Sequence, residues 1–273
     1  LLINKICFIA INFNNAQLTL NFVKNLNGLT KSNPQEILDI IIIDNGSNQE
    51  DTCILDKETQ SISNVTLIKS SINHGYFGGL NLGLKYIENS SYKYVIICNN
   101  DLEFDSDFLL KLDTVKFEKS VLALAPDVET VTGVHQNPLR KTRISKIEKV
   151  KNDIYWSNYY IMILLKTVYN ILKTNKTIKN TKINKSMYIE AGIGACYVLT
   201  SHFFKYYSLL DAKVFLWGEE AIFSEQVRRV SGKILYVPEL HVLHQESQSV
   251  KKIPSRKKYE MVRKSYNIYK KYL

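Results

Sequence analysis

Acidic side chains crowd directly behind one of the most apolar stretches of the chain. The residues "YVIIC" at 94–98 are followed by two asparagines and then by Asp101, Glu103, Asp105 and Asp107. Asparagine and aspartate are common in turns, and acids favour helix starts, so a strand, a turn and a capped helix would explain the pattern. Carboxylates at the end of a buried strand can also hold a divalent cation or a phosphate-bearing ligand. This stretch alone leaves both interpretations open.

Glycines gather in a second stretch, "NHGYFGGLNLG" at residues 73–83. Gly75, Gly78, Gly79 and Gly83 are four of the eleven glycines of the chain. Glycine lets the backbone approach a ligand closely and leaves the N–H groups of a helix start free for an anion. The spacing is not the dinucleotide pattern G-x-G-x-x-G, so hydride transfer is not favoured. A purely structural tight turn is the alternative.

A third candidate is Asp44, which closes the apolar run "IIIID" and precedes "NGS". A carboxylate at the end of a strand can accept a hydrogen bond from a ribose hydroxyl or a nucleobase N–H. A β-turn or a helix cap is the structural alternative, because Asp, Asn, Gly and Ser all favour turns.

The elements that must position these residues alternate between two periodicities. Continuous apolar, β-branched runs are separated by segments with helical spacing, which predicts a largely parallel sheet covered on both faces. Ligands of such α/β sheets bind beyond the carboxyl ends of the strands. The predicted strands lie at 5–13, 38–47, 64–70 and 92–101, and the predicted helices at 15–31 and 78–89.

The pattern changes after the strand predicted at 121–128. Residues 154–172 are aromatic and apolar enough for a helix that lies on another part of the molecule, and the polar segment 173–185 reads as a loop. Regular structure resumes at 188–204. A helix that follows Gly218 and ends near Gly232 is expected to lead into a further strand.

The composition bounds the class of protein. With 273 residues, of which 45% are hydrophobic, the chain can bury a sizeable core. No apolar run approaches the length of a membrane span, and the start "LLINKICFIAINF" is interpreted as a strand and not as a signal peptide. The four cysteines lack metal-ligand spacing, which favours reduced thiols in a cytosol.

The net charge of +10 is concentrated in two segments. Residues 140–185 contain twelve Lys or Arg against two acidic residues, and residues 251–273 contain nine against one. The remainder of the chain is therefore acidic. Such basic segments can serve a nucleic acid, an anionic membrane surface or an anionic substrate.

Seven motifs in order resemble a known family. They are "AINFNN", "IIIDNGS", "NHGYFGGLNLG", "CNND", "GIGACYV", "WGEEAIF" and "VPELHVLHQES". Together they resemble the GT-A glycosyltransferases of family 2, most closely the bacterial rhamnosyltransferase-like members that build surface polysaccharides. The likeness covers roughly residues 5–125 and 187–270.

The resemblance implies an α/β fold of the GT-A, Rossmann-like type. It consists of a mostly parallel sheet flanked by helices, here with a basic helical insert and a C-terminal helix. The implied division is a nucleotide-sugar-binding half at 1–125, the basic insert at 126–186, an acceptor-binding and catalytic half at 187–250 and a basic C-terminal helix at 251–273.

The same resemblance assigns residues to the nucleotide-sugar and to a metal. Asp101 is expected to hold a divalent cation, Mg²⁺ or Mn²⁺, with His244 and Glu103 as further metal ligands; His241 is expected to pack. Oxygen donors and phosphates suit such a cation, which would stabilise the departing nucleoside diphosphate. The residues expected to contact the nucleotide-sugar are Phe13, Asn14, Asp44, Asn73, Gly75, Gly79, Asn99, Asn100 and Asp101.

For catalysis, the resemblance points to the acidic pair Glu219 and Glu220. Direct displacement at an anomeric carbon needs a carboxylate that takes the proton of the acceptor hydroxyl. Glu220 is the expected base, and Glu219 is expected to orient it or to bind the acceptor. Trp217 and Gly194 are expected to contact the acceptor. The alternative is that acids at a helix start only complement its dipole.

The predicted function is an inverting glycosyltransferase of bacterial surface polysaccharide biosynthesis, using dTDP-rhamnose or a UDP-hexose and a glycan or lipid-linked glycan acceptor. The prediction places the protein in the cytoplasm, with an anionic membrane surface as a further partner, no nucleic acid, and a homodimer left open. Two alternatives are a sugar nucleotidyltransferase, which would release pyrophosphate, and a basic nucleic-acid-binding protein.

Overall fold

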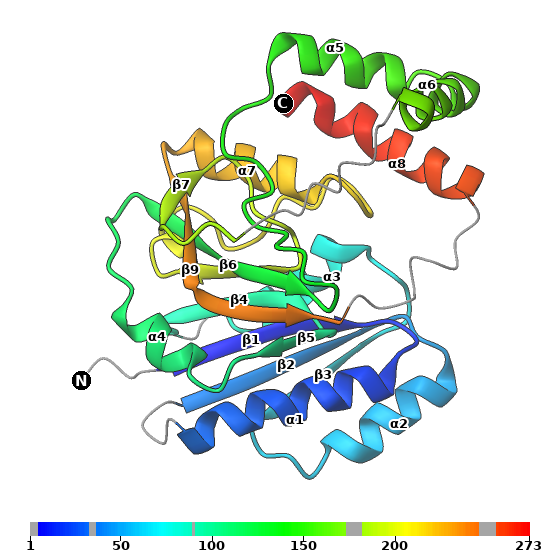
Figure 1. Cartoon of the computed structure of the whole chain (residues 1–273). Helices are drawn as coiled ribbons and strands as arrows, with labels where there is room; N and C mark the ends of the chain where they lie inside the picture. The colour runs from blue at the N-terminus through cyan, green and yellow to red at the C-terminus, as the bar shows by residue number, and fades with distance from the viewer. Residues whose placement is uncertain (1–4, 33–36, 89–90, 173–181, 246–254) are drawn as a thin grey trace.

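A computed structural model describes residues 5–32, 37–88, 91–172, 182–245 and 255–273 (Figure 1). One nine-stranded sheet runs through it in the order β3-β2-β1-β4-β8-β6-β9-β5, with β7 paired to β9. The strands are β1 (Lys5–Asn12), β2 (Ile37–Asn45), β3 (Val65–Ser70), β4 (Tyr94–Asn99), β5 (Leu102–Phe104), β6 (Val121–Thr130), β7 (Met187–Ile189), β8 (Cys196–Thr200) and β9 (Lys233–His244).

The sheet has a parallel part and a mixed part. Strands β3, β2, β1 and β4 run parallel, as their continuous apolar sequences predict. Strand β8 then runs antiparallel to both β4 and β6, while β6 and β9 are parallel. The expected mostly parallel sheet is therefore correct for the first half of the chain, and the second half is mixed. Strand β6 runs across the predicted boundary at residue 125.

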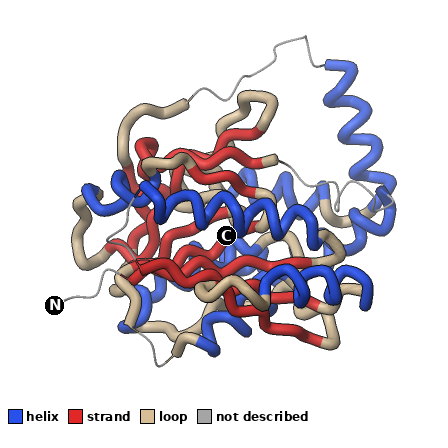
Figure 2. The backbone as a smooth tube through the Cα atoms, turned by 90° about the horizontal axis from the view of Figure 1, so that it is seen from below, coloured by secondary structure: helices blue, strands red, loops and turns tan. Residues whose placement is uncertain are grey.

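Helices cover both faces of the sheet (Figure 2). Phe22 of α1 and Phe108 of α4 pack on one face, together with Phe104 of β5. Phe77 of α3 and Phe223 of α7 pack on the other. The helices around the sheet are α1 (Ala16–Ser32), α2 (Gln49–Thr59), α3 (Tyr76–Tyr86), α4 (Phe108–Thr114), α7 (Glu219–Arg229) and the short 3₁₀ helix η1 (Phe203–Lys205).

A separate layer lies beyond α7, at the top of Figure 1. It consists of α5 (Lys146–Tyr155), α6 (Tyr159–Leu172), α8 (Ser255–Tyr269) and the 3₁₀ turn η2 (Lys270–Tyr272). The helix expected at 154–172 is in fact divided, because α5 ends at Tyr155 and the Asn158 side chain accepts from the Tyr160 backbone N–H at 2.8 Å, at the start of α6. Most of the loop expected at 173–185 lies outside the described residues.

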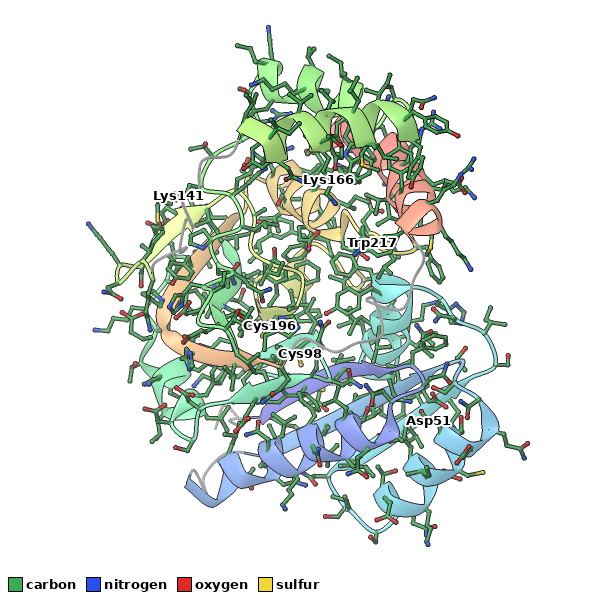
Figure 3. The ribbon with its side chains drawn as sticks, turned by 45° about the vertical axis from the view of Figure 1, so that its right-hand side comes forward. Asp51, Cys98, Lys141, Lys166, Cys196 and Trp217 are labelled. Carbon is green, nitrogen blue, oxygen red and sulfur yellow. The ribbon has the colours of Figure 1, made fainter. Side chains whose placement is uncertain are left out.

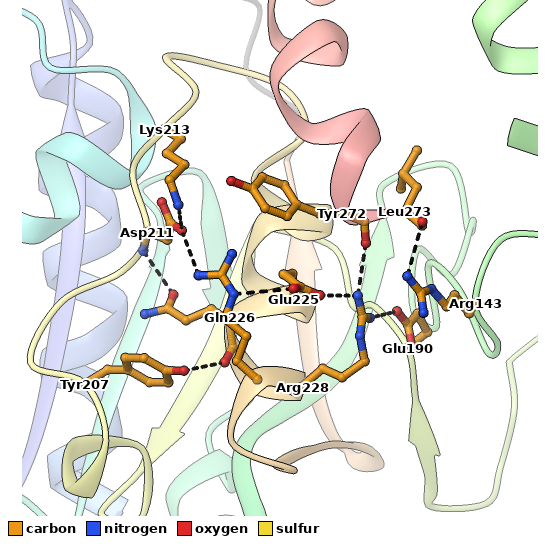
Figure 4. A network of polar contacts seen from close by, with 11 residues as sticks. Arg143, Glu190, Tyr207, Asp211, Lys213, Glu225, Gln226, Arg228, Tyr272 and Leu273 are labelled. Carbon is orange, nitrogen blue, oxygen red and sulfur yellow. Dashed lines mark hydrogen bonds and ion pairs between the residues drawn. The ribbon is translucent and has the colours of Figure 1, made fainter.

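The C-terminal helix packs on the body of the molecule. The Trp156 ring stacks on Tyr259 of α8 with centroids 5.4 Å apart. At the other end, Arg228 of α7 donates to the backbone carbonyl of Tyr272 at 3.0 Å and also contacts Glu190 and Glu225 (Figure 4). These contacts join the insert, α7 and the end of the chain into one layer.

All four cysteines are free thiols. Cys98 and Cys196 lie opposite each other on β4 and β8, in the middle of the sheet (Figure 3). Burial raises the pKa of both thiols, so they behave as apolar core residues. Within the described ranges, no helix combines the length and the apolar composition needed to cross a bilayer.

Candidate active site

The carboxyl ends of β1, β2 and β4 meet at one edge of the sheet. Asn12 pairs in register with Asp44, and Ile11 with Asn99. The parallel arrangement of these strands therefore brings together the three polar stretches at 12–14, 44–47 and 99–101, as expected for a ligand site of an α/β sheet.

Asn12 is the centre of this edge, although the sequence analysis did not single it out. It is fully buried, and its amide nitrogen lies within hydrogen-bond distance of Asp44 (3.2 Å), Ser47 (3.0 Å) and Asp51 (2.6 Å). Its amide oxygen accepts from Thr19 at 2.8 Å. A strand-final asparagine was the available signal, but only the register shows how many elements it joins.

Asp44 is also buried and engaged. Its side chain accepts from Asn12 through one oxygen and from the Thr52 hydroxyl through the other, at 2.5 Å. Phe13 and Asn14 are exposed beside it, and Asn14 accepts from the Asn48 backbone N–H at 2.8 Å. Of the residues predicted here, Phe13 presents a free aromatic surface, whereas Asp44 anchors the start of α2.

The glycine-rich turn is packed against protein atoms. Asn45 holds it by donating to Asn73 at 3.1 Å and to the Gly75 carbonyl at 3.0 Å. Gly75 has a φ of +75°, and a Cβ atom there would lie 2.1 Å from the Phe215 carbonyl oxygen. A Cβ on Gly79 would lie 2.7 Å from the Ile11 side chain. These glycines therefore let α3 approach the sheet and the 215 loop.

The acidic turn joins two distant segments. The Asp101 carboxylate lies 3.3 Å from Nε2 of His244, whose Nδ1 is 2.7 Å from Gln136. The contact forms because Leu102 of β5 pairs with His244 of β9. Sequence analysis predicted both residues as metal ligands, and the structure brings them together.

The other residues of this turn differ in their environment. Asn100 donates to Thr19 at 2.7 Å, Asn99 is half-buried at the end of β4, and the exposed Glu103 accepts from Gln245 at 3.1 Å. Asp101 and Glu103 line one pocket between α1 and β5. Over the described residues, no cluster of three or more His, Cys, Asp or Glu side chains is arranged to hold a metal.

His241, expected to pack, instead bridges two carboxylates. Its ring nitrogens lie 3.0 Å from Asp105 and 3.0 Å from Glu129. These hydrogen bonds connect the β5 loop to β6 and raise the pKa of the imidazole against the opposing effect of burial. His241 therefore holds the loop that contains Asp105 against β6.

A second polar region lies at the start of α7, where Glu219 and Glu220 form the first turn. Glu219 is 4% exposed, and within the described part of the chain its Oε1 has no hydrogen-bond partner. Burial, with a smaller contribution from the charge of Glu220, raises the pKa of Glu219 to about 8. Glu220 is partly exposed and accepts from the Gly194 N–H at 3.2 Å; desolvation also raises its pKa.

Tyr76 connects the two regions, and sequence analysis did not single it out. Its hydroxyl donates at 2.8 Å to the carbonyl of Gly194, the same residue whose N–H donates to Glu220. Burial raises the pKa of the Tyr76 phenol, and nearby negative charges, Glu219 and Asp101 among them, raise it further. Tyr76 therefore joins α3 to the Gly194 loop, which also bonds to Glu220.

The wall of the glutamate turn comes from the C-terminal helix. Gly218 has a φ of +99°, and a Cβ there would lie 2.1 Å from the Tyr269 ring. Ser265 donates to the Leu216 carbonyl at 2.7 Å. The half-buried Trp217 has Lys258 above its ring at 5.7 Å (Figure 3), so it is not part of the core.

With this geometry established, the comparisons with known proteins decide the family. A model described as "Glycosyl transferase family 2" matches residues 7–176, more than half of the chain. The chain belongs to glycosyl transferase family 2. The match includes the strand edge, the glycine-rich turn and the acidic turn, and it continues through α5 and α6. It ends before Glu219, Glu220 and His244.

One curated relative is the low-salt glycan biosynthesis hexosyltransferase Agl10 of Haloferax volcanii. It is 26% identical over 102 residues, which are 37% of this chain and 32% of the relative. The chain thus spans about a third of that protein. The rhamnosyltransferase-like subfamily is not among the features that these comparisons support.

Solved structures share the fold at low identity. GalNAc-T7 with UDP, GalNAc and Mn²⁺ has a TM-score of 0.55 at 14% identity, covering 89% of this chain and 44% of its own. The mannosyltransferase PcManGT of Pyrobaculum calidifontis with GDP-Man and Mn²⁺ scores 0.54 at 13%, covering 89% and 57%. S. aureus TarS 1–349 scores 0.54 at 11%, covering 88% and 60%. The fold is therefore GT-A, as predicted.

Proposed function

We propose that the protein transfers a sugar, with inversion, from a nucleoside diphosphate sugar to a hydroxyl of a glycan or lipid-linked glycan. The observation that carries the proposal is the presence of two separate acidic groups. Asp101 contacts His244 at the strand edge. Glu220, at the start of α7, accepts from Gly194, whose carbonyl accepts from the Tyr76 hydroxyl. A displacement reaction needs this division, with leaving-group stabilisation at one end and a base at the other.

The donor half of the proposal uses the sheet edge. The exposed ring of Phe13 can stack on a nucleobase, and the polar edge around Asn14 can meet the ribose. Asp44 supports this surface from below through its bonds to Asn12 and Thr52. The contacts of Asn73, Gly75, Gly79, Asn99 and Asn100 with the donor stay predictions.

Asp101 and His244 would hold the divalent metal. A carboxylate and an imidazole supply two donors, and a Mg²⁺ or Mn²⁺ ion can complete its shell with diphosphate oxygens and water. Such an ion neutralises charge on the departing nucleoside diphosphate. Glu103 lies on the same pocket but bonds to Gln245, so it is the weaker candidate.

Glu220 is the proposed base, because it is the partly exposed member of the pair. Its carboxylate is oriented by the Gly194 N–H, and its raised pKa suits a base that works near neutral pH. Glu219, with a pKa of about 8, keeps its proton below that pH and so leaves Glu220 free to carry the charge. Trp217 and Gly194 flank the turn as proposed acceptor contacts.

The donor sugar is narrowed only by the relatives. Agl10 is named a hexosyltransferase of glycan biosynthesis, which favours a hexosyl donor and does not specify its nucleotide. Use of dTDP-rhamnose and a role in bacterial surface polysaccharide assembly stay predictions, as do a cytoplasmic location, the absence of nucleic-acid partners and a homodimer. The family favours glycosyl transfer over nucleotidyl transfer.

The test is calorimetric titration with UDP, dTDP, GDP and CDP, each with Mn²⁺ and then with EDTA. One or two nucleotides are expected to bind with Mn²⁺, and binding should be lost in EDTA and in Asp101→Ala. The matched control is Asp107→Ala, an exposed acid of the same segment that pairs with Lys111 on the surface. Absence of nucleotide binding by folded protein, or release of pyrophosphate in a turnover assay, would contradict the proposal.

A further inference from the structure

Helix α6 is largely apolar and buries none of its residues. Its polar side chains Lys166, Thr167 and Asn170 have the spacing of one helix side, and Lys166 is its only charged residue. Leu164, Ile171 and Leu172 are 63%, 77% and 74% exposed. A contiguous exposed apolar patch marks an interaction site.

Helix α5 extends this surface. Ile147, Val150 and Ile154 recur at helical spacing and are 70%, 57% and 49% exposed. Trp156 and Asp153 point the other way, toward Tyr259 and Tyr266 of α8. The outer stripe of α5 and the whole of α6 form what we call the insert surface, on the side of the molecule opposite α1 and α2 (Figure 1).

The first turn of α6 is attached to α8. Tyr159 contacts the Tyr259 ring edge-on at 5.3 Å, and Asn158 caps this turn. Beyond it most residues of the helix are exposed as far as Leu172. The folded chain therefore anchors the helix but buries none of its residues.

The helices of this layer carry many basic side chains. They are Lys146, Lys149 and Lys151 on α5, Lys166 on α6, and Arg256, Lys257, Arg263 and Lys264 on α8. The acids of the layer are largely engaged: Asp153 accepts from Tyr266, Glu148 pairs with Arg140 and Glu260 pairs with Arg256. Each Lys or Arg near an anionic lipid surface adds to the attraction, and salt screens it.

We infer that the insert surface docks on an anionic lipid bilayer, with α6 lying in the plane of the interface. With 14 residues the helix is about 21 Å long, too short for the roughly 30 Å of hydrocarbon core, so it cannot span. An exposed apolar helix face combined with basic residues is the pattern of helices that lie in the membrane–water interface. A second copy of the chain fits poorly, since its insert, residues 140–185, would bring a second large positive charge.

The docking goes beyond the proposed function. It also indicates the side from which an acceptor would reach the site. Glu220 lines a pocket with Arg140, Arg143 and Tyr269, beneath α5 and beside the end of the chain. A bilayer at the insert surface would lie on the same side as this pocket. A glycan carried on a membrane lipid phosphate could then reach Glu220 from its anchor; this last step rests on the proposed function.

The experiment is sedimentation with vesicles of phosphatidylcholine, with and without phosphatidylglycerol, at low and high salt. The protein should bind the anionic vesicles, and salt should weaken binding. The double variant Leu164→Asp/Ile171→Asp should bind at least about tenfold more weakly. It replaces two apolar side chains, which the bilayer would bury, with charged ones. Leu110→Asp, a 55% exposed leucine on α4, is the matched control and should bind as the parent does.

Three results would overturn the inference. The first is failure of the parent protein to bind anionic vesicles at low salt. The second is equal loss of binding in the Leu110 variant. The third is a concentration-dependent dimer that the double variant abolishes, without vesicle binding by the parent protein. Nucleotide binding by the double variant should equal that of the parent, so failure of docking and failure of the proposed function remain distinguishable.

Discussion

The sheet edge and the glutamate turn, residues 219–220 at the start of α7, differ in how completely their buried polar groups are hydrogen-bonded. At the edge, Asn12, Asp44 and Thr52 are buried or half-buried and bond to one another. At the turn, Glu219 is buried with an oxygen that finds no partner within the described residues. The edge is a closed network that holds strands and helices together, whereas the turn keeps unused hydrogen-bonding capacity.

The difference has an energetic meaning. A buried polar group that is bonded contributes modestly to stability, whereas an unbonded one costs free energy on folding. The pKa of about 8 at Glu219 expresses that cost, since burial disfavours its charged form. Substitutions at the edge should therefore reduce stability, and those at the turn should reduce activity while sparing or improving stability.

The largest expected effect tests the turn. Glu220→Gln removes the proposed base, so kcat should fall by roughly 10³-fold with an unchanged melting temperature. Glu239→Gln, an exposed acid on β9, is the control and should keep full activity. Steady-state kinetics with the identified donor provides the measurement. If Glu219→Gln loses activity and Glu220→Gln keeps it, the two roles must be exchanged.

The next effect tests the packing at the glycine-rich turn. Gly75→Ala should lower the free energy of unfolding by about 3 kcal/mol or more, because of the positive φ and the 2.1 Å approach to Phe215. Gly28→Ala in α1 is the contrast: its Cβ meets nothing within 4 Å, so the variant should gain about 0.5–1 kcal/mol. Urea denaturation measures both. A neutral Gly75→Ala would show that the turn rearranges freely.

A third effect is the pH dependence of stability caused by Glu219. Its pKa is about 8 in the folded protein and near 4.5 when unfolded, so between these values the unfolded chain releases a proton that the folded chain keeps. The free energy of unfolding should therefore fall as pH rises from 5 to 8, by roughly 1 kcal/mol per pH unit. Glu219→Gln should reduce this slope, and the remainder comes from groups such as Glu220, whose pKa burial also raises. Equal slopes in both proteins would mean that Glu219 is ionised when folded.

The smallest effect concerns one hydrogen bond of the edge. Thr52→Val removes the donor to Asp44 and should cost roughly 1–2 kcal/mol of unfolding free energy. Thr52→Ser keeps the hydroxyl and should cost less. Denaturant midpoints at constant m-value give the comparison. An equal or larger loss in Thr52→Ser would show that the methyl group, which only Thr52→Val retains, contributes at least as much as the hydrogen bond.

Much of the sheet edge was predictable, because apolar runs that end in polar residues mark parallel strands. The Asp101–His244 contact was predictable only through family resemblance, because the two residues are 143 positions apart and meet through the β5–β9 pairing. Asn12 and Tyr76 were missed, because the type of a residue does not show how many hydrogen-bond partners its side chain will have. The glycine stretch left a ligand contact and a tight turn open; a Cβ on Gly75 or Gly79 would meet protein atoms, and contact of their backbone with the donor stays a prediction.

The insert shows the limit of pattern reading. The composition of residues 154–172 predicts a helix that lies on another surface. Composition alone does not show whether that surface is protein. In the structure the helix breaks near Asn158, and α6 buries none of its residues. Periodicity reports which faces are apolar, and tertiary contacts decide what meets them.

The contact between Gly218 and Tyr269 links the end of the chain to the glutamate turn as an evolutionary constraint. A side chain at 218 would overlap the ring at 269, so neither position can change freely while the other stays as it is. Relatives that carry a larger residue at 218 should carry a smaller one at 269, and a swap of C-terminal helices between relatives should fail unless the turn is exchanged with it. The glutamate turn and the last helix would then be inherited together.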